Sequence, residues 1–237
     1  METIIKASTP DAAGASAVSW GRLLSNLADD QKRIWMFPSS VKRGKKWVGM
    51  LAVGGITAAL IPLDRVEPPY FRHSTDFERF NATFSGRNTS MIIAGVPACF
   101  LVTGLFRRDS YARSTALLAG EAVVDAEILT SAMKNVGHRL RPAAMPINQP
   151  DGGTWFRDKG VTLGGAGSFP SGHTIAAFSV ATVFSQRYRN HRWVPYVSYG
   201  LAGIIGFSRI SLLSHFSSDV FVGAALGYSI SRFVVLP

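Results

Sequence analysis

The sequence predicts an all-α fold: an integral membrane bundle of six transmembrane helices with an N-terminal amphipathic helix at the membrane surface. Three observations predict this class. Six apolar runs recur along the 237 residues; hydrophobic residues make up 47% and charged residues only 17%; and glycines such as Gly223 and Gly227 lie inside the runs. About 20 apolar residues cross a bilayer, and small residues let membrane helices approach closely.

The six runs define the order of the predicted spans. They cover 47–63, 88–106, 114–133, 174–186, 193–208 and 220–231. The first two are long enough to span outright, whereas the last three are short and also fit buried helices of a soluble protein. Glu121, Asp125 and Glu127 interrupt the third run. We expect these carboxylates to pair with a cation or polar group inside the bundle rather than to contact a substrate.

Residues 1–46 are predicted to form a cytoplasmic segment, and residues 47–237 to form the membrane domain. Within the segment, positions 20–38 mix residues such as Trp20 and Trp35 with Arg22, Lys32 and Arg33. Basic amphipathic helices of this kind lie on membrane surfaces, although an ordinary surface helix remains an alternative. Residues 1–19 lack the apolar run of a secretory signal, so a soluble secreted enzyme is not expected.

The formal net charge of +10 suits an anionic partner, whether nucleic acid, lipid head group or phosphorylated substrate. If there are six spans, the basic segments 1–46, 107–113 and 187–192 share one side with both termini, which the positive-inside rule makes cytoplasmic. The other side is also basic. The positive-inside rule does not explain the cations of that side, which are Lys134, Arg139, Arg141, Arg157, Lys159 and Arg209. The single cysteine, Cys99, excludes an intramolecular disulfide and a zinc site of several thiolates.

Two motifs on the non-cytoplasmic side indicate anion binding. Lys134 and Arg141 are seven residues apart, and on a continuing helix they would share a face. Ser171 is a candidate N-cap, Gly172 lets an oxyanion approach the backbone, and His173 would point at that anion. Taken singly, each pattern is better explained structurally, the first by a cation pair at a helix end and the second by a structural histidine.

A third motif combines Arg209, His215 and Asp219. The spacing of His215 and Asp219 corresponds to one helical turn. A carboxylate on one imidazole nitrogen fixes the tautomer and leaves the other nitrogen as a nucleophile. Arg209 supplies a planar fork for phosphoryl oxygens. An isolated His-x-x-x-Asp pattern would be weak evidence.

Together, Lys-x6-Arg-Pro, Pro-Ser-Gly-His and Ser-Arg-x5-His-x3-Asp fix eleven positions between residues 134 and 219. This arrangement resembles the type 2 phosphatidic acid phosphatase (PAP2) superfamily, in its membrane lipid phosphatase branch. The superfamily also contains soluble acid phosphatases and vanadium haloperoxidases. The first half of the chain adds little to the resemblance.

The resemblance implies a role for each position. His215 is expected to attack phosphorus and form a phosphohistidine, Asp219 to orient it, and His173 to act first as general acid and then as base. The implied phosphate cradle consists of Lys134, Arg141, Ser171, Gly172 and Arg209. Because cations and helix-start amides can stabilise phosphoryl transfer themselves, no metal and no cofactor are expected.

The predicted activity is hydrolysis of a lipid phosphate monoester or diphosphate, of the phosphatidic acid, phosphatidylglycerol phosphate or undecaprenyl diphosphate type. The expected partners are a phospholipid or isoprenoid phosphate and the bilayer, without nucleic acid, and the oligomeric state is open. The site would lie on the outer face of a bacterial inner membrane, where Trp155 and Phe156 either anchor at the boundary or pack the loop. A lipid phosphotransferase and a non-catalytic anionic-lipid binder are the alternatives. The apolar runs argue against a soluble haloperoxidase.

Overall fold

The computed structural model describes residues 20–40, 46–146, 153–158, 160, 162, 165 and 167–236. Every regular element in these ranges is a helix, which confirms the predicted all-α class. In chain order the elements are η1 (Trp20–Arg22), α2 (Leu23–Ser40), α3 (Lys46–Leu60), α4 (Leu63–His73), α5 (Glu78–Thr83), α6 (Gly86–Phe106), α7 (Ser110–Gly137), η3 (Pro142–Ala144), α8 (Gly172–Arg187), α9 (Trp193–Ser211), α10 (Ser217–Ile230) and η4 (Ser231–Val235). Residues 1–19 and 41–45 of the predicted N-terminal segment lie outside the described residues.

Helices α3, α6, α7, α8, α9 and α10 occupy the six predicted apolar runs. By length and hydropathy, two helical stretches of the described chain could cross a membrane, Gly86–Phe106 and Ser217–Val235. A third is possible if α3 and α4, which are bent by 51° at their junction, count as one span. Helix α8 has 16 residues, or about 24 Å at 1.5 Å per residue, which is less than the roughly 30 Å of bilayer hydrocarbon. The count of six spans therefore stays a prediction.

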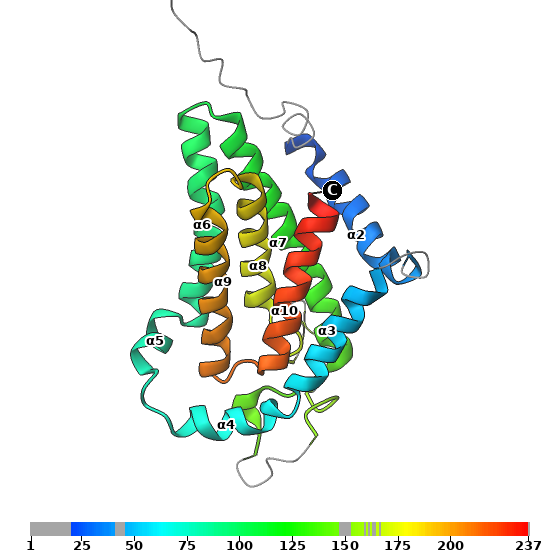
Figure 1. The fold of residues 1–237 in the computed structure, drawn as a ribbon, viewed down its shortest axis with the longest axis vertical. Helices are drawn as coiled ribbons and strands as arrows, with labels where there is room; N and C mark the ends of the chain where they lie inside the picture. The colour runs from blue at the N-terminus through cyan, green and yellow to red at the C-terminus, as the bar shows by residue number, and fades with distance from the viewer. Residues whose placement is uncertain are drawn as a thin grey trace, which may run out of the picture.

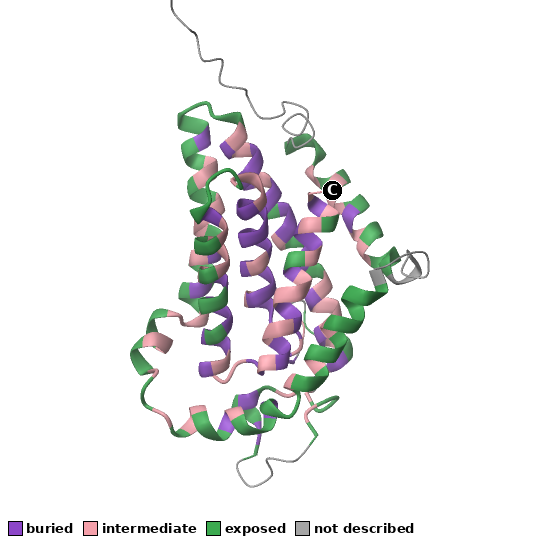
Figure 2. Cartoon of the chain, in the orientation of Figure 1, coloured by how far each residue is buried: buried purple, intermediate pink, exposed green. Residues whose placement is uncertain are grey.

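Helices α6 to α10 run side by side along the long axis of the molecule, and α8 contacts α7, α9 and α10 (Figure 1). Buried residues gather on α8 and on the sides of α7 and α10 next to it, whereas α3 is mostly exposed (Figure 2). Ile175 and Val183 of α8 are completely buried. A Cβ added to Gly227 of α10 would clash with the Ile175 carbonyl. The small residues of the 223–227 pair thus let α10 pack closely against α8.

Local capping explains where two of the bundle helices begin and where α7 ends. The Ser85 hydroxyl accepts a hydrogen bond from the amide of Asn88 at the start of α6, at 3.4 Å. The Asp109 carboxylate accepts from the Tyr111 amide, at 2.9 Å, at the start of α7. These are ordinary N-cap contacts. Helix α7 stops after Gly137 because His138 adopts a left-handed conformation, with φ of 41°.

The predicted amphipathic helix is present as η1 and α2, and it packs against α7. Its buried contact is polar, because the Gln31 amide donates to the Asp125 carboxylate at 2.8 Å. Asp30 is also buried there, whereas Trp20 and Leu24 are exposed. Asp125 therefore has the polar partner expected for it. Glu127 instead interacts with the charge of Lys134, seven residues farther along α7.

Candidate active site

The three motifs meet at one end of the bundle, the lower end in Figure 1. They lie at the end of α7, at the start of α8 and in the turn between α9 and α10. Most of the predicted site residues are buried. The buried ones are Lys134, Ser171, Gly172, Arg209, His215 and Asp219. His173 is half-buried and Arg141 is exposed.

His215 lies in the turn between α9 and α10, where its amide donates to the Arg209 carbonyl at 3.1 Å. Its Nδ1 is 2.6 Å from the carbonyl oxygen of Ser168. Because a carbonyl oxygen only accepts, Nδ1 carries the hydrogen, and in the neutral ring Nε2 holds the lone pair. Burial lowers the pKa of His215, although the nearby Asp219 acts in the opposite direction. The neutral, nucleophilic form of the ring is therefore favoured.

Asp219 organises the start of α10 and faces the same ring nitrogen from farther away. Its Oδ2 accepts from the Phe216 amide at 3.0 Å and lies 3.9 Å from His215 Nδ1. The two residues are one helical turn apart in sequence but do not lie in one helix, because α10 begins only at Ser217. The closer partner of Nδ1 is the Ser168 carbonyl, a backbone atom that no sequence pattern indicates.

His173 is the second residue of α8 and contacts the start of α6. Its Nε2 is 3.1 Å from the Gly86 carbonyl and 3.1 Å from the Ser90 hydroxyl. Its ring lies close enough to Arg209, Lys134 and His215 to interact electrostatically with them. The structure thus brings the predicted acid, the predicted nucleophile and two predicted phosphate-binding cations together.

The cations reach this end from three different segments. Lys134 lies in the last turn of α7, with its Nζ 3.6 Å from the place that a Cβ on Gly172 would occupy. Arg209 is 2% exposed and donates to the Thr89 hydroxyl at 2.9 Å. Arg141 does not share a helix face with Lys134, as the spacing suggested, because α7 ends at Gly137. Its charge nevertheless acts on both Lys134 and His215.

Ser171 occupies the N-cap position of α8, as predicted, but its side chain does not cap the helix. Its hydroxyl is 2.8 Å from the Thr174 hydroxyl, and its amide donates to the Asp219 carbonyl at 3.2 Å. The first amides of a helix have no intrahelical acceptor and favour an anion. The start of α8, beside Lys134 and His173, is therefore suited to phosphate.

Sequence reasoning missed two buried residues that support this site. Arg139 donates to Asp219 through Nη1 and to Asp64 Oδ2 through Nη2, the latter at 2.7 Å. Asp64 is on α4 and also accepts from the Ser218 amide at 3.2 Å. Arg139 stood out only as an unexplained cation, and nothing in the sequence indicated Asp64.

The loop before α8 also contacts Arg139. The Trp155 ring lies 4.8 Å from the guanidinium carbon and 4.9 Å, centroid to centroid, from the Phe169 ring. Trp155 therefore packs the loop, whereas Phe156 is 76% exposed. Within the part of the chain that the structure describes, no three His, Cys, Asp or Glu side chains form a group that could hold a metal ion.

The family model described as PAP2 superfamily matches residues 115–236, just over half of the chain. The chain belongs to the PAP2 superfamily. The matched stretch contains all eleven motif positions, so the resemblance indicated by the motifs is confirmed. Asp64 lies outside the matched stretch, and its contact with Arg139 joins the first half of the chain to the PAP2 site.

Two curated proteins and one solved structure are similar to this PAP2 chain. A lipid A 1-phosphatase of Porphyromonas gingivalis is 44% identical over 63 residues, which are 26% of this chain and only 14% of that protein. A probable lipid phosphate phosphatase 4 of Arabidopsis thaliana is 26% identical over 217 residues, 80% of this chain and 70% of that one. The crystal structure of a transmembrane PAP2 type phosphatidylglycerolphosphate phosphatase from Bacillus subtilis aligns with a TM-score of 0.40 and 17% identity, over 93% of this chain and 88% of that one.

Proposed function

We propose that this protein is a membrane-bound phosphatase that hydrolyses a phosphate monoester or diphosphate on a lipid, through a phosphohistidine and without a metal. The observation that carries the proposal is the state of His215. Its ring is buried, its Nδ1–H is donated to the Ser168 carbonyl at 2.6 Å, and its Nε2 keeps a lone pair. Membership of the PAP2 superfamily supports the reaction class.

In the proposed mechanism the phosphoryl group binds among Lys134, Arg141 and Arg209, with its oxygens at the first amides of α8. Catalysis of phosphoryl transfer consists mostly of positioning and of stabilising charge on the equatorial oxygens. Three cations and a helix start supply both. Arg209 offers the phosphate a guanidinium in a fixed position, because its side chain is buried and donates to the Thr89 and Ser208 hydroxyls.

The chemical steps follow from the two histidines. His215 Nε2 forms a bond to phosphorus while the bond to the leaving oxygen breaks, and that oxygen takes a proton from His173. Water then attacks phosphorus and passes a proton to His173 as the P–N bond breaks. The phosphorylated ring is positive, so the Ser168 carbonyl and the Asp219 carboxylate, 3.9 Å from Nδ1, stabilise it.

An apolar groove supports a lipid as the substrate. The groove has a volume of about 430 Å³ and is lined by α6, α8 and α9. It begins one helical turn from the site on each helix: Ile93 lies four residues after Thr89, Ala177 four after His173, and Ile205 four before Arg209. A hydrocarbon chain in the groove would place its phosphate at the cradle. Phosphatidic acid, phosphatidylglycerol phosphate and undecaprenyl diphosphate are the candidate classes.

The proposal includes six spans in a bacterial inner membrane, with the site on the outer side. The basic connections 107–113 and 187–192 lie at the upper end in Figure 1, opposite the site. α2 lies toward that end as well. The positive-inside rule favours a cytoplasmic position for that end.

The test is phosphate release in EDTA by protein purified in detergent, from a panel of lipid monophosphates and diphosphates. We expect release by the wild type and by His73→Ala, which replaces an exposed histidine outside the site, but none by His215→Ala. Equal release by His215→Ala would refute the nucleophile. Loss of release in EDTA, restored by a divalent cation, would refute metal independence. Product on an acceptor lipid instead of free phosphate would identify a phosphotransferase.

A further inference from the structure

Helix α4 exposes an apolar face, unlike a helix of a water-soluble domain. Leu63, Val66 and Tyr70 are 50%, 65% and 58% exposed. Their spacing of three and four residues places them on one face of the helix. Asp64 is only 4% exposed. The apolar face therefore points away from the protein and a charged side chain points into it.

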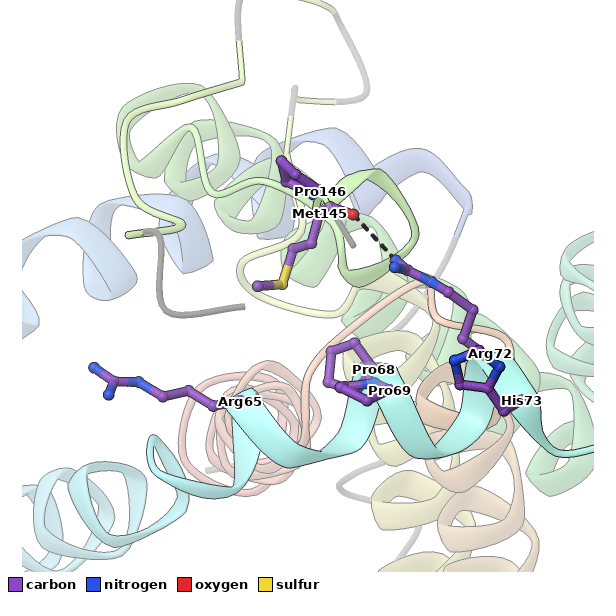
Figure 3. Close-up of a pocket in the computed structure, with 7 residues that line it drawn as sticks. All are labelled: Arg65, Pro68, Pro69, Arg72, His73, Met145 and Pro146. Atoms are coloured by element: carbon purple, nitrogen blue, oxygen red, sulfur yellow. Dashed lines mark hydrogen bonds between the residues drawn. The ribbon is translucent and has the colours of Figure 1, made fainter. Parts of the chain in front are cut away.

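Hydrogen bonds at both ends of α4 fix this orientation. At its start, Asp64 accepts from Arg139 and Ser218, and the Glu67 carboxylate accepts from the Ser217 amide at 3.0 Å. At its end, Arg72 points at the segment after η3 and donates to the Met145 carbonyl at 3.2 Å (Figure 3). Rotation of α4 to bury its apolar face would break these contacts.

The position of α4 indicates what covers that face. The helix lies across the catalytic end of the bundle, below the ends of α9 and α10 (Figure 1). It follows α3, a helix with exposed apolar side chains such as Leu51, after a bend of 51°. Phe156, in the loop at the same end, is exposed as well. The apolar surface of α3 thus continues onto α4 where the bundle ends.

We propose that α4 is an in-plane helix of the membrane surface. Leu63, Val66 and Tyr70 lie in the boundary between acyl chains and head groups of the leaflet at the catalytic end, and the polar side holds Arg139 and the start of α10. Such a boundary suits an apolar face with a tyrosine. This inference rests on the proposed function only in that the bundle spans a bilayer. It places the cradle at head-group depth.

The test measures the depth of α4 with nitroxide spin labels and needs no activity. The chain has one cysteine, Cys99, exposed within α6, and the wild type labelled there gives a reference inside the bilayer. In a Cys99→Ala background, Val66→Cys reports the apolar face of α4. Asp76→Cys, on the exposed connection between α4 and α5, is the matched control.

Each labelled protein is reconstituted into phosphatidylethanolamine–phosphatidylglycerol vesicles, and relaxation of the label by oxygen is compared with relaxation by a water-soluble nickel chelate. We expect oxygen to dominate at position 66, at a depth shallower than at Cys99, and the chelate to dominate at position 76. A label at 66 as accessible to the chelate as at 76 overturns the proposal. A label at 66 as deep as at Cys99 also overturns it, because α4 would then continue the span of α3.

Leu63→Cys repeats the measurement on the same face, in case the label at position 66 disturbs the fold. The whole set is also measured in a His215→Ala background. Depth at position 66 is then independent of turnover. A protein that keeps His215, shows no phosphatase activity and carries a shallow label at position 66 would contradict the proposed function and leave the position of α4 supported.

Discussion

The catalytic end of the bundle and the contact between α2 and α7 bury carboxylates in different ways. At the catalytic end, Asp64 and Asp219 share one guanidinium, that of Arg139, which is 2% exposed. Breaking a buried ion pair is costly, because the remaining charge has no compensation. Pairing with Arg139 compensates both buried carboxylates, so they can fix the position of the turn that carries His215.

Near the middle of α7, α2 packs against acidic side chains without such a partner. Asp30, Glu121 and Asp125 are all buried, and the cation beside them, Arg33, is exposed and 3.7 Å from Asp30. Among the described residues, Glu121 Oε2 and Asp125 Oδ2 have no hydrogen-bond partner. Burial raises the pKa of Asp30. The comparison indicates that the carboxylates beside the turn that carries His215 have a buried cation as partner, whereas burial at the α2–α7 contact favours the protonated form of Asp30.

The largest effect is expected from removing the shared cation. Arg139→Met should lower the free energy of unfolding by about 3–5 kcal/mol and abolish turnover, because two buried carboxylates lose their partner. Unfolding by denaturant in detergent measures the first, and phosphate release the second. Arg157→Met, which replaces an exposed arginine at the same end, is the control. Equal stability of the two variants would contradict the role of Arg139.

The next effect is a loss of turnover without a loss of stability, which distinguishes a residue of the proposed reaction from the buried ion pairs at the same end. His173→Ala should reduce turnover by about 10²- to 10⁴-fold, the usual contribution of acid–base catalysis. Its stability should change little, because the half-buried ring contacts only the Gly86 carbonyl and Ser90 in the hydrogen bonds described. Turnover is compared between an alkyl and an aryl phosphate. If both leaving groups lose the same factor, His173 is not the acid.

A smaller effect on kcat should distinguish Asp64 from Glu67, the other carboxylate of α4 at the start of α10. Asp64→Asn should lower kcat about ten-fold, because about 1.5 kcal/mol of charge-assisted bonding is lost. Glu67→Gln also removes a carboxylate at the start of α10, but one bound to the Ser217 amide, so its kcat should stay near wild type.

The pH profile shows whether Asp64 acts electrostatically or only through packing. Loss of its negative charge leaves the positive charge of Arg139 less compensated, which should lower the pKa of His215 further. The acid limb of kcat/KM, which reports the free enzyme, should then move to lower pH in Asp64→Asn and not in Glu67→Gln. The profile is measured with two substrates whose phosphate groups have different pKa values. A limb that comes from the substrate shifts between them, whereas a limb that comes from the enzyme does not. An unmoved limb would make Asp64 merely structural.

Asp64 also illustrates what the sequence could and could not predict. Long apolar runs located α3, α6 and α9, and the motif spacing identified residues such as His215 and Lys134. The contact between Asp64 and Arg139 joins positions 75 apart, which no local pattern relates. Spacing failed where a helix ended early: α7 stops before Arg141, and α10 starts after His215. The Ser168 carbonyl is a backbone atom and leaves no trace in the sequence.

The smallest effect concerns the α2–α7 contact, where Arg33, the cation paired with Asp30, is exposed. Because the pKa of Asp30 is raised by burial, the folded protein holds a proton that the unfolded chain has already released above about pH 4. Its contribution to stability is complete below that pH and is lost as pH rises through the folded pKa. Asp30→Asn should therefore gain stability relative to wild type between pH 4.5 and pH 7. The pair with exposed Arg33 is worth at most about 1 kcal/mol, so at pH 7 the variant should be at least as stable as wild type within that margin.

Unfolding measured at pH 4.5 and pH 7 checks this prediction, with Asp29→Asn as the exposed control. A stability difference independent of pH would mean that Asp30 is as fully charged as Asp219. The contrast between the carboxylates paired with Arg139 and those at the α2–α7 contact would then fail.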